Sequence, residues 1–216
     1  MPKSGLRVSV LILVFCCMFL GCRSVYYSTW EKLGKYKRDL LKENVQEARD
    51  DQKKATEQFK DALTRLKERY GFEGGNLEKT YSKLKSDFDR CQERAAAVKG
   101  RIQKVEQISS DLFKEWSDEI RSMTNEKLKS SSEEKLRETR SKYETLHAAM
   151  KKAEASMEPV LAQFHDQVLY LKHNLNAQAI GSLKGESVNI ENEIQRLIRD
   201  MDASIIEADS FVKGLP

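Results

Sequence analysis

The sequence contains few residues that interrupt helices and no pattern that predicts a β-strand. Only three prolines occur in 216 residues, and no alternating run of Val, Ile or Thr is bounded by turn residues. Charged residues make up 33% of the chain and apolar residues 39%, with Lys, Glu, Arg, Leu and Ala predominating. Because this composition is typical of long amphipathic helices and coiled coils, the sequence predicts an all-α fold and excludes one built on a β-sheet.

Blocks of like charge are also absent. The formal net charge is only +4, two of the basic residues (Lys3 and Arg7) precede residue 22, and acidic and basic side chains are interleaved along the rest of the chain. A protein that binds nucleic acid needs a stripe of basic residues that contacts phosphates and releases counterions. We therefore expect no nucleic acid among the partners.

A single long apolar run is present, and it lies at the N-terminus. Met1–Arg7 is short and basic, Val8–Leu20 is almost wholly apolar, and Gly21–Cys22 comes directly after it. The run has the length of the hydrophobic region of a signal peptide, and it is too short to cross about 30 Å of hydrocarbon as a helix. The order of these segments predicts an export signal at residues 1–21.

The residues around Cys22 resemble a lipobox, in which a small residue precedes a cysteine that is lipidated and becomes the mature N-terminus. Gly21 and Cys22 fit this pattern, whereas Phe19 and Leu20 are bulkier than the residues usually found there. The resemblance implies cleavage before Cys22, a diacylglycerol on its thiol and a further acyl chain such as palmitate. It also implies the outer membrane, facing the periplasm of a Gram-negative bacterium, because Arg23 is not the aspartate associated with retention in the inner membrane. An ordinary secretory signal and an uncleaved anchor are the alternatives.

Cysteine is scarce in the chain that would remain after cleavage. Two cysteines would leave with the signal peptide and Cys22 would carry lipid, so that Cys91 would be the only free thiol. No intramolecular disulfide can then form. We expect Cys91 to be buried and inert in a helix seam, between Phe88 and Ala95. A nucleophile or an intermolecular disulfide partner is the alternative interpretation.

Apolar residues in the rest of the chain recur at alternating spacings of four and three. They form three long runs and a looser, shorter one, at Leu41–Leu66, Leu77–Trp116, Leu136–Asn174 and Ile190–Ala208. A 3.5-residue repeat that continues over several heptads predicts a left-handed, coiled-coil-like seam, and short connections favour antiparallel neighbours. The predicted fold is an elongated antiparallel coiled-coil-like bundle of three long helices plus a shorter C-terminal helix.

Three segments between these runs predict the turns. Tyr70–Asn76 contains three glycines and an asparagine suited to capping the next helix, Asn125–Ser132 is polar, and Gly181–Glu186 contains two glycines. Ser131 and Glu134 have the S-x-x-E spacing of a capping box, which would begin the third helix.

The predicted helices imply a rod. A helix of about 45 residues is about 70 Å long. Pro159 removes a backbone donor within the third helix and predicts a kink near Ala155–Glu158. The predicted organisation is a lipoprotein signal peptide at 1–21, a lipidated N-terminus and tether at 22–32, and a single helical coiled-coil domain at 33–216.

No set of residues predicts catalysis, a metal site or a cofactor site. Glu144 and His147 have the E-x-x-H spacing of di-iron helices, but the second copy that such a site needs is missing. His165 and His173 would lie about 12 Å apart along one helix, so they cannot share a metal on their own. No Ser-His-Asp order, phosphate-binding glycine loop or paired-carboxylate cleft is recognisable either. We therefore predict that the protein is not an enzyme and has no metal or other cofactor.

The segment Asp166–Ile180 carries many amides for a helix seam. Gln167, Asn174 and Gln178 fall at or beside seam positions, and buried amides in coiled coils commonly fix register and partner orientation. The alternative interpretation is a polar recognition surface near a loop after Ile180. That surface would be formed by Lys172, His173, Asn174 and Asn176.

Short motifs are spread over the whole mature chain. Besides the lipobox they are Tyr26–Tyr27, Lys37–Asp39, Glu47–Arg49, Gly74–Gly75 and, above all, Leu171–Ala177 (LKHNLNA). In this combination the chain resembles a family of bacterial lipoproteins, domain of unknown function 2959. The resemblance implies a helical lipoprotein of a Gram-negative bacterium and brings no activity, substrate or catalytic residue with it.

These observations favour a non-catalytic structural or interaction protein of the cell envelope. Lipid would hold the chain at the membrane, and the rod would present surfaces to another envelope protein, to peptidoglycan or to a second copy of the chain. The alternative is a periplasmic carrier or chaperone-like module that takes an apolar ligand or an unfolded client between its helices. It is suggested by the Met and aromatic residues of the third run: Tyr143, Met150, Met157, Phe164 and Tyr170.

Lipid on Cys22 would place one end of the rod near the membrane. The turn at Tyr70–Asn76 would then lie far from the bilayer, Asn125–Ser132 would return close to it, and the loop after Ile180 would be distant again. We therefore expect the polar stretch at residues 171–177 to face away from the bilayer.

Overall fold

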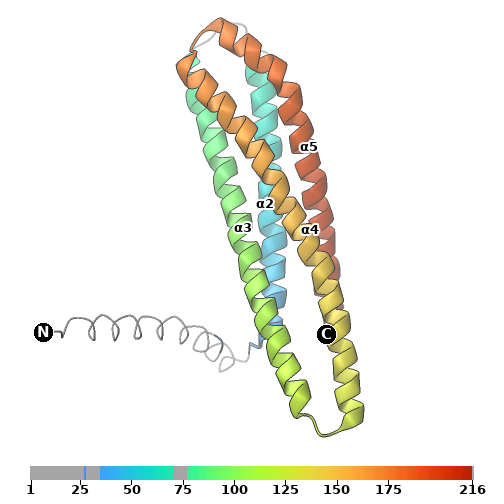
Figure 1. Ribbon diagram of the computed structural model, residues 1–216. Coiled ribbons are helices and arrows are strands. Elements are labelled where there is room, and N and C mark those ends of the chain that lie inside the picture. Colours follow the sequence, from blue (N-terminus) through green and yellow to red (C-terminus); the bar gives the residue numbers. More distant parts are fainter. Residues whose placement is uncertain (1–26, 28–34, 71–76, 216) are drawn as a thin grey trace, which may run out of the picture.

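Four long α-helices make up almost all of the described chain (Figure 1). The computed structural model describes Tyr27, residues 35–70 and residues 77–215. Within these ranges no strand occurs, and the predicted all-α, antiparallel arrangement is confirmed. The helices are α2 (Lys37–Tyr70), α3 (Leu77–Ser122), α4 (Glu126–His173) and α5 (Ala177–Gly214).

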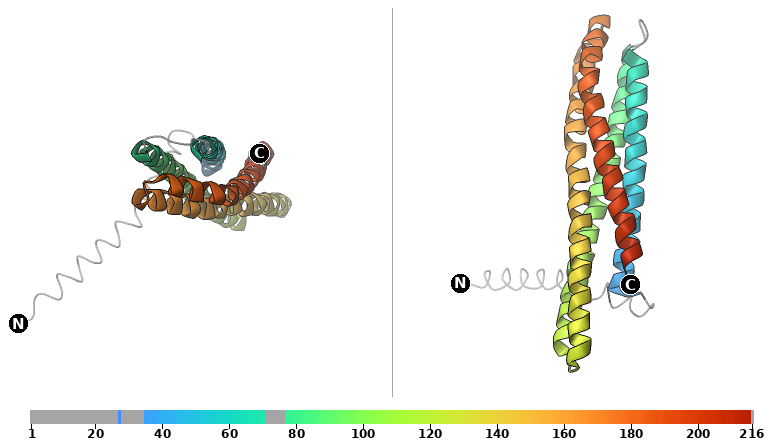
Figure 2. Two further views of the ribbon diagram at one scale, coloured as in Figure 1. Left: turned by 90° about the horizontal axis from the view of Figure 1, so that it is seen from above. Right: turned by 90° about the vertical axis from the view of Figure 1, so that its right-hand side faces the viewer.

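The helices form a closed ring when the rod is seen along its axis (Figure 2). α3 packs between α2 and α4, and α5 packs between α4 and α2. The C-terminal helix therefore docks along the rod, so that the first and last described helices are neighbours. This is the geometry of an up-and-down four-helix bundle.

The rod has two different ends (Figures 1 and 2). With 46 and 48 residues, α3 and α4 are each about 70 Å long, whereas the 34 and 38 residues of α2 and α5 give about 51 and 57 Å. Where α2 begins and α5 finishes, the α3–α4 hairpin continues beyond both. We call this end the base, the projecting hairpin (residues 119–129) the tip, and the opposite end, where α4 joins α5, the distal end.

The predicted heptad residues form the core of the rod. Phe88 of α3 and Phe164 of α4 meet edge to face with ring centroids 6.1 Å apart. Burying one large apolar side chain contributes about 1.5–3 kcal/mol, so the whole seam stabilises the rod rather than any one contact. All eight predicted seam residues of α2 are buried: Leu41, Val45, Ala48, Gln52, Ala55, Phe59, Ala62 and Leu66.

Interleaved charges connect neighbouring helices on the surface of the rod. Because exposed pairs contribute at most about 1 kcal/mol each, most of them specify which helices are neighbours more than they stabilise the fold. The Lys152–Asp200 pair is an exception because its carboxylate is buried. The hydrogen bond from Arg49 lowers the pKa of Asp209, and the same bond raises the pKa of Arg49. One pair at each interface is Lys37–Glu115 at 2.6 Å (α2–α3), His147–Glu106 at 2.7 Å (α3–α4), Lys152–Asp200 at 2.9 Å (α4–α5) and Arg49–Asp209 at 2.6 Å (α2–α5).

The third helix begins earlier than predicted. Asn125 is its N-cap, because the side-chain Oδ1 accepts hydrogen bonds from the backbone N–H groups of Lys127 and Leu128, both at 3.1 Å. The capping box predicted at Ser131–Glu134 is therefore wrong. The first turns of α4 lie in the projecting hairpin and have only α3 to pack against. Few apolar residues are needed there, and the heptad pattern starts only at Leu136.

The loop predicted at Gly181–Glu186 is also wrong. α5 begins at Ala177 and runs through both glycines, and Asn174–Asn176 forms the turn instead. A Cβ atom at Gly181 or Gly185 would meet nothing within 4 Å, so no close approach requires glycine there. Glycine costs a helix interior about 1 kcal/mol relative to alanine, and the seam that α5 shares with its two neighbours offsets this cost. With 38 residues α5 is shorter than α3 and α4 but longer than α2.

Some predicted features are not tested by the described residues. α4 continues through Pro159, and the kink near Ala155–Glu158 stays a prediction. The signal peptide, Cys22 and the caps in the turn at 71–76 lie outside the described residues. None of the helices in the described ranges is apolar and long enough to cross a membrane.

Candidate interaction surface at the distal end

Tyr27 attaches the N-terminal part of the chain to the base of the rod. Its hydroxyl donates a hydrogen bond to Asp111 Oδ2 of α3 at 2.6 Å, and its ring centroid lies 4.7 Å from Lys37 Nζ. Lys37 in turn forms an ion pair with Glu115, one turn further along α3. Because Tyr27 is buried, the chain meets the bundle at a fixed point, and that point lies at the opposite end from the α4–α5 turn.

Two asparagines build the α4–α5 turn. The backbone N–H of Asn174 donates to the Leu171 carbonyl oxygen at 3.3 Å, and its Nδ2 donates to the Tyr170 carbonyl oxygen at 2.9 Å. Asn176 is the N-cap of α5, and its Oδ1 accepts from the Ala179 N–H at 2.9 Å. Asparagine is favoured at an N-cap because its short side chain satisfies a backbone donor that the helix leaves free. Both side chains therefore have a structural role.

The structure contains elements of both interpretations of the LKHNLNA region. The prediction of buried amides is right for Gln167, which is buried, and wrong for Gln178, which is exposed. The predicted recognition residues lie together at the distal end, two in the last turn of α4 and two in the adjoining turn. They are Lys172 and His173, which are exposed, Asn174, which is half-buried, and Asn176, which is exposed.

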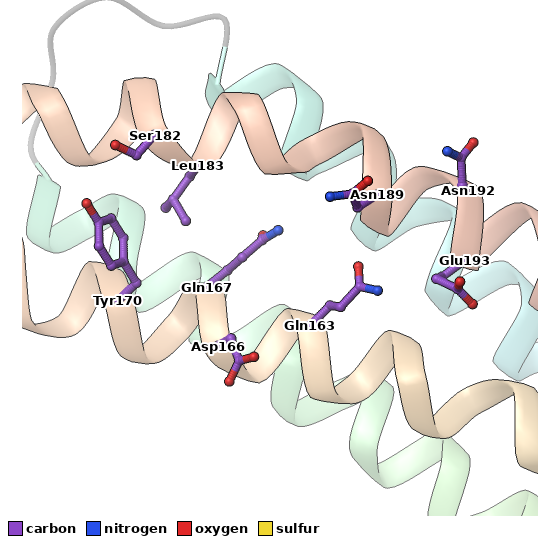
Figure 3. A pocket seen from close by; sticks show the side chains of 9 residues that line it. All are labelled: Gln163, Asp166, Gln167, Tyr170, Ser182, Leu183, Asn189, Asn192 and Glu193. Atoms are coloured by element: carbon purple, nitrogen blue, oxygen red, sulfur yellow. The ribbon is translucent and has the colours of Figure 1, made fainter.

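A groove runs between α4 and α5 beside the distal turn (Figure 3). Its volume is about 680 Å³. Gln163 and Gln167 extend from α4 toward α5, and Leu183 and Glu193 extend from α5 toward α4 (Figure 3). The described residues that line the groove are Gln163, Asp166, Gln167, Tyr170, Ser182, Leu183, Asn189, Asn192 and Glu193.

Amides and carboxylates are the most frequent residue types along the groove, although more of its exposed lining surface is apolar than polar. Of the nine described lining residues, four are amides, two are carboxylates and none is basic. Each amide group can donate and accept hydrogen bonds, and the exposed ring of Tyr170 adds an apolar face. A ligand that offers both donors and acceptors, such as a polypeptide backbone or a glycan, matches this chemistry. A phosphate does not, because phosphate recognition uses Arg, Lys or free backbone N–H groups.

Large apolar side chains are exposed around the same end. Among the described residues eight such side chains are exposed, and single ones need no explanation. Several of them grouped around one turn are typical of a contact surface. Four lie around the distal turn and the groove: Leu169, Tyr170, Leu175 and Val188. The others are Tyr36, Met123, Leu128 and Ile206, in the base half of the rod.

Polar pairs buried between helices specify how the helices align. Gln52 of α2 and Ser204 of α5 exchange hydrogen bonds of 3.0 and 3.1 Å. Between α4 and α5 the Ser156 hydroxyl donates to one oxygen of Asp200, and Lys152 Nζ donates to the other at 2.9 Å. Burial alone would raise the pKa of Asp200, but the hydrogen bonds from Ser156 and Lys152 outweigh it and the pKa is lowered. A shift of one helix along its neighbour would leave these buried polar groups without hydrogen-bond partners, so the pairs favour the observed register.

Cys91 lies in the core, as predicted. It is fully buried, and its Sγ lies 3.9 Å from the carbonyl oxygen of Gln58. Burial raises the pKa of the thiol to about 12. Because the thiolate is the nucleophilic form, this cysteine is almost wholly unreactive at neutral pH.

The histidines of the candidate metal motifs have other partners. His147 Nε2 lies 2.7 Å from Glu106 Oε1 of α3, and its ring stacks on Tyr143 with centroids 5.7 Å apart. The ring of His165 lies 5.3 Å from that of Phe88, centroid to centroid. In the part of the chain that the structure describes, no three His, Cys, Asp or Glu side chains are close enough to hold a metal ion. His147 thus links α3 to α4.

Most of the residues that suggested a carrier belong to the core. Met150, Met157 and Phe164 are buried, and Tyr143 packs against the same core cluster. Tyr170 alone of the five lines the groove, whose other lining residues are mainly polar. These side chains therefore give no separate support to an apolar ligand site between the helices.

A family model matches residues 26–215, and its description is protein of unknown function, DUF2959. The chain belongs to this family. The matched region of this DUF2959 protein includes Tyr27, all four described helices and the distal turn, and it confirms the family resemblance seen in the sequence motifs. No curated protein and no solved structure matches the chain.

Sequence reasoning missed the groove, although the sequence contains a signal for it. Gln163 and Gln167 are four residues apart, and Asn189 and Asn192 are three apart, so that each pair occupies one face of its helix. Once the turn is placed at Asn174–Asn176, the two faces lie on adjacent antiparallel helices. Gly181 and Gly185 predict a loop more strongly than Asn174 and Asn176 do, so the turn was predicted too late in the chain. With the turn in that place, the two amide pairs are not predicted to face each other.

Proposed function

We propose that this DUF2959 protein is a non-catalytic lipoprotein of the Gram-negative cell envelope that acts as a membrane-tethered structural or interaction protein. Lipid on Cys22 holds the base of the rod at the outer membrane, on the periplasmic side, and the distal end contacts a partner. The observation that carries this proposal is the separation of the two ends. Tyr27 docks at the base, five residues after Cys22, and the groove with its exposed apolar rim lies at the distal end.

The anchor is supported by the order of the N-terminal segments. A basic start, the apolar run Val8–Leu20 and then Gly21–Cys22 is the order of a signal peptide followed by a lipidated cysteine. Two or more acyl chains hold a protein stably, because each buried methylene contributes about 0.8 kcal/mol.

A non-catalytic role is supported by the partners of the reactive side chains. Cys91 is buried in the core, and His147 is bound to Glu106. The buried carboxylates Asp87 and Asp200 are bound to basic residues of the same or neighbouring helices. An enzyme site needs a nucleophile or base that is oriented and open to substrate, whereas these groups are used in packing.

The chemistry of the distal end indicates the class of partner. An envelope protein and peptidoglycan both present amide groups with which the side chains of Gln163 and Asn192 in the groove can pair. Leu175 and Val188 add exposed apolar surface next to it, as in the centre of many protein contacts. A second copy of the chain is the third partner with suitable chemistry, and the two carboxylates of the groove, Asp166 and Glu193, disfavour any nucleic acid.

Photo-crosslinking in intact cells tests this proposal. A photoreactive amino acid at Lys172 or at Leu175, both exposed at the distal end, is expected to capture the same partner in repeated experiments. Gln103 and Ala155 are exposed on the shaft and serve as controls for random collisions. Equal capture from the shaft, or monomer alone from both distal positions, would contradict the proposal.

A further inference from the structure

The tip extends about as far beyond the docking point of Tyr27 as the tether can reach. Tyr27 binds Asp111, and from there α3 and the following turn continue about 20 Å to the apex at Thr124. Four residues lie between Cys22 and Tyr27, so five Cα–Cα steps join the two. A fully extended chain covers at most about 3.6 Å per residue, so this tether spans no more than about 18 Å whatever its conformation.

The two lengths restrict how a rod anchored at Cys22 can stand. If the base faces the bilayer, the tip lies at the lipid surface or within a few ångströms of it even when the tether is fully extended. If the distal end faced the bilayer, about 50 Å of four-helix body would lie between Tyr27 and that end, far more than the tether allows. The remaining orientation has the rod lying on its side.

The side chains of the tip favour the upright orientation over the flat one. Leu128, with 63% of its surface exposed, and Met123 are exposed apolar residues. Three basic residues (Arg121, Lys127 and Lys129) and two acidic ones (Glu119 and Glu126) lie beside them, so the tip has a small excess of positive charge. Arg121 is paired with Asp118, just before the tip. Apolar side chains flanked by basic ones are typical of segments that lie at a lipid interface, where the basic groups meet anionic headgroups. Of the eight exposed large apolar residues among the described ranges, Ile206 alone lies near the middle of the shaft, and the residue one turn before it is the exposed, acidic Asp202 rather than a basic one.

The tip is also held firmly enough to carry a contact. Trp116 Nε1 donates a hydrogen bond to Ser132 Oγ at 2.9 Å across the hairpin. Ile120 is buried between the two helices, and Asn125 caps α4. The projecting hairpin is thus an ordered extension of the bundle.

We infer that the α3–α4 hairpin tip contacts the headgroup region of an anionic lipid surface and props the rod upright on the membrane. The inference rests on the proposed lipidation of Cys22, because the short tether holds the tip at the surface at high effective concentration. Polar backbone groups at the turn keep the contact in the headgroup region and out of the hydrocarbon.

Depth-dependent quenching on vesicles tests the inference. The full lipidated protein is placed on vesicles of phosphatidylethanolamine and phosphatidylglycerol that contain a headgroup nitroxide lipid. It carries a fluorophore on Thr124→Cys, with Ala155→Cys on the shaft and Gly185→Cys at the distal end as matched exposed controls. The buried Cys91 gives the background. We expect strong quenching at Thr124→Cys and little at the two controls.

The outcomes separate the tip contact from the anchor. Equal quenching at all three positions, on protein that floats with the vesicles, would overturn the upright contact and leave the lipid anchor standing. Protein that does not float with the vesicles would overturn the anchor and, with it, the inference.

Two further variants test the contact by changing the tip or the tether and not the labelled position. Met123→Ser with Leu128→Ser changes exposed residues only, and it should reduce quenching while flotation and helical content stay unchanged. An insertion of twenty Gly and Ser residues between Cys22 and Tyr27 should lower the effective concentration of the tip about tenfold. Quenching that survives both changes in full would contradict a contact made through the tip.

Discussion

The two ends of the rod are built from the same element, a turn between antiparallel helices, and both expose apolar side chains, yet the distal end adds a groove lined by amides and carboxylates. At the tip, exposed apolar residues stand beside basic ones, and the hairpin has no further helix around it. At the distal end, amides and carboxylates line a groove between α4 and α5, and no described lining residue is basic. The comparison shows that two turns of one bundle expose different side chains when different numbers of helices surround them, and our proposals assign a lipid surface to the tip and a polar polymer to the distal end.

Of the changes considered, removal of the proposed lipid should have the largest effect, because it should release the base from the membrane. Cys22→Ala takes away the proposed acceptor of the acyl chains, so the protein should leave the membrane fraction almost completely and lose incorporation of labelled palmitate. Cell fractionation and metabolic labelling measure both effects. The matched control is Cys91→Ala, which should stay in the membrane fraction. Full retention of the Cys22→Ala protein would show that another feature holds the base at the membrane.

A cavity in the core should lower the stability of both ends of the rod together. Phe164 is almost fully buried, and Phe164→Ala should destabilise the bundle by about 3–5 kcal/mol, through lost burial and the cavity left behind. Urea unfolding followed by circular dichroism measures the change. If only one end lost protection in hydrogen exchange, the two ends would be independent folding units and not parts of one cooperative bundle.

The carboxylate of Asp200 should make the α4–α5 contact sensitive to acid. Its pKa is lowered in the folded state, so its contribution is complete above the unfolded pKa of about 3.9 and is lost as the pH falls through the folded value. Asp200→Asn should cost about 1–3 kcal/mol at pH 7 and should be less sensitive to acid than the native chain. Equal loss of stability between pH 7 and pH 3 in both proteins would contradict this role.

The two helix caps allow a direct test of one end against the other. Asn125→Ala and Asn176→Ala each remove a cap at one turn and should each cost about 1 kcal/mol. Hydrogen exchange should speed up at the tip in the first variant and beside the groove in the second. Crosslinking from Leu175 should weaken only in the Asn176→Ala protein. A loss of crosslinking in both variants would mean that the two ends are coupled.

Helix-stabilising substitutions near the groove should have the smallest effect. Nothing lies within 4 Å of a Cβ atom built at Gly181, Gly185 or Gly100. Each glycine changed to alanine should therefore stabilise the protein by about 0.5–1 kcal/mol, visible as a higher Tm. Gly100 lies on the shaft and serves as the control. If Gly181→Ala and Gly185→Ala impaired capture of the partner while Gly100→Ala did not, the start of α5 would have to flex during recognition.

The parts of the fold that depend on repeating burial could be predicted from the sequence. The seam of α2 is an example: Leu41, Phe59 and Leu66 recur at heptad spacing because each is packed in the core of the bundle. The same reasoning gave the all-α class and the burial of Cys91, since both follow from which side chains avoid water. The antiparallel order followed from the short connections between the apolar runs.

The parts that depend on which neighbours are present could not be predicted in the same way. α4 starts before its heptad pattern because the tip has a single packing partner, and sequence periodicity does not report how many helices surround a segment. The α4–α5 turn was misplaced because exposed glycines can be tolerated within a helix that packs on two others. Tyr27, Asp111 and the amide groove required the arrangement in space, since their partners lie far apart in the sequence.

The closure of the ring by α5 has a consequence for how the molecule is made. Gln52 is paired with Ser204, which comes 152 residues later, so α2 lacks one of its two neighbours until the end of the chain is available. Contacts of such large sequence separation form late and slowly, because the loop must close before the contact is gained. While the chain is still being synthesised or exported, the face of α2 that carries Gln52 and Thr56 stays uncovered. The rod can complete its fold only after the last helix has emerged.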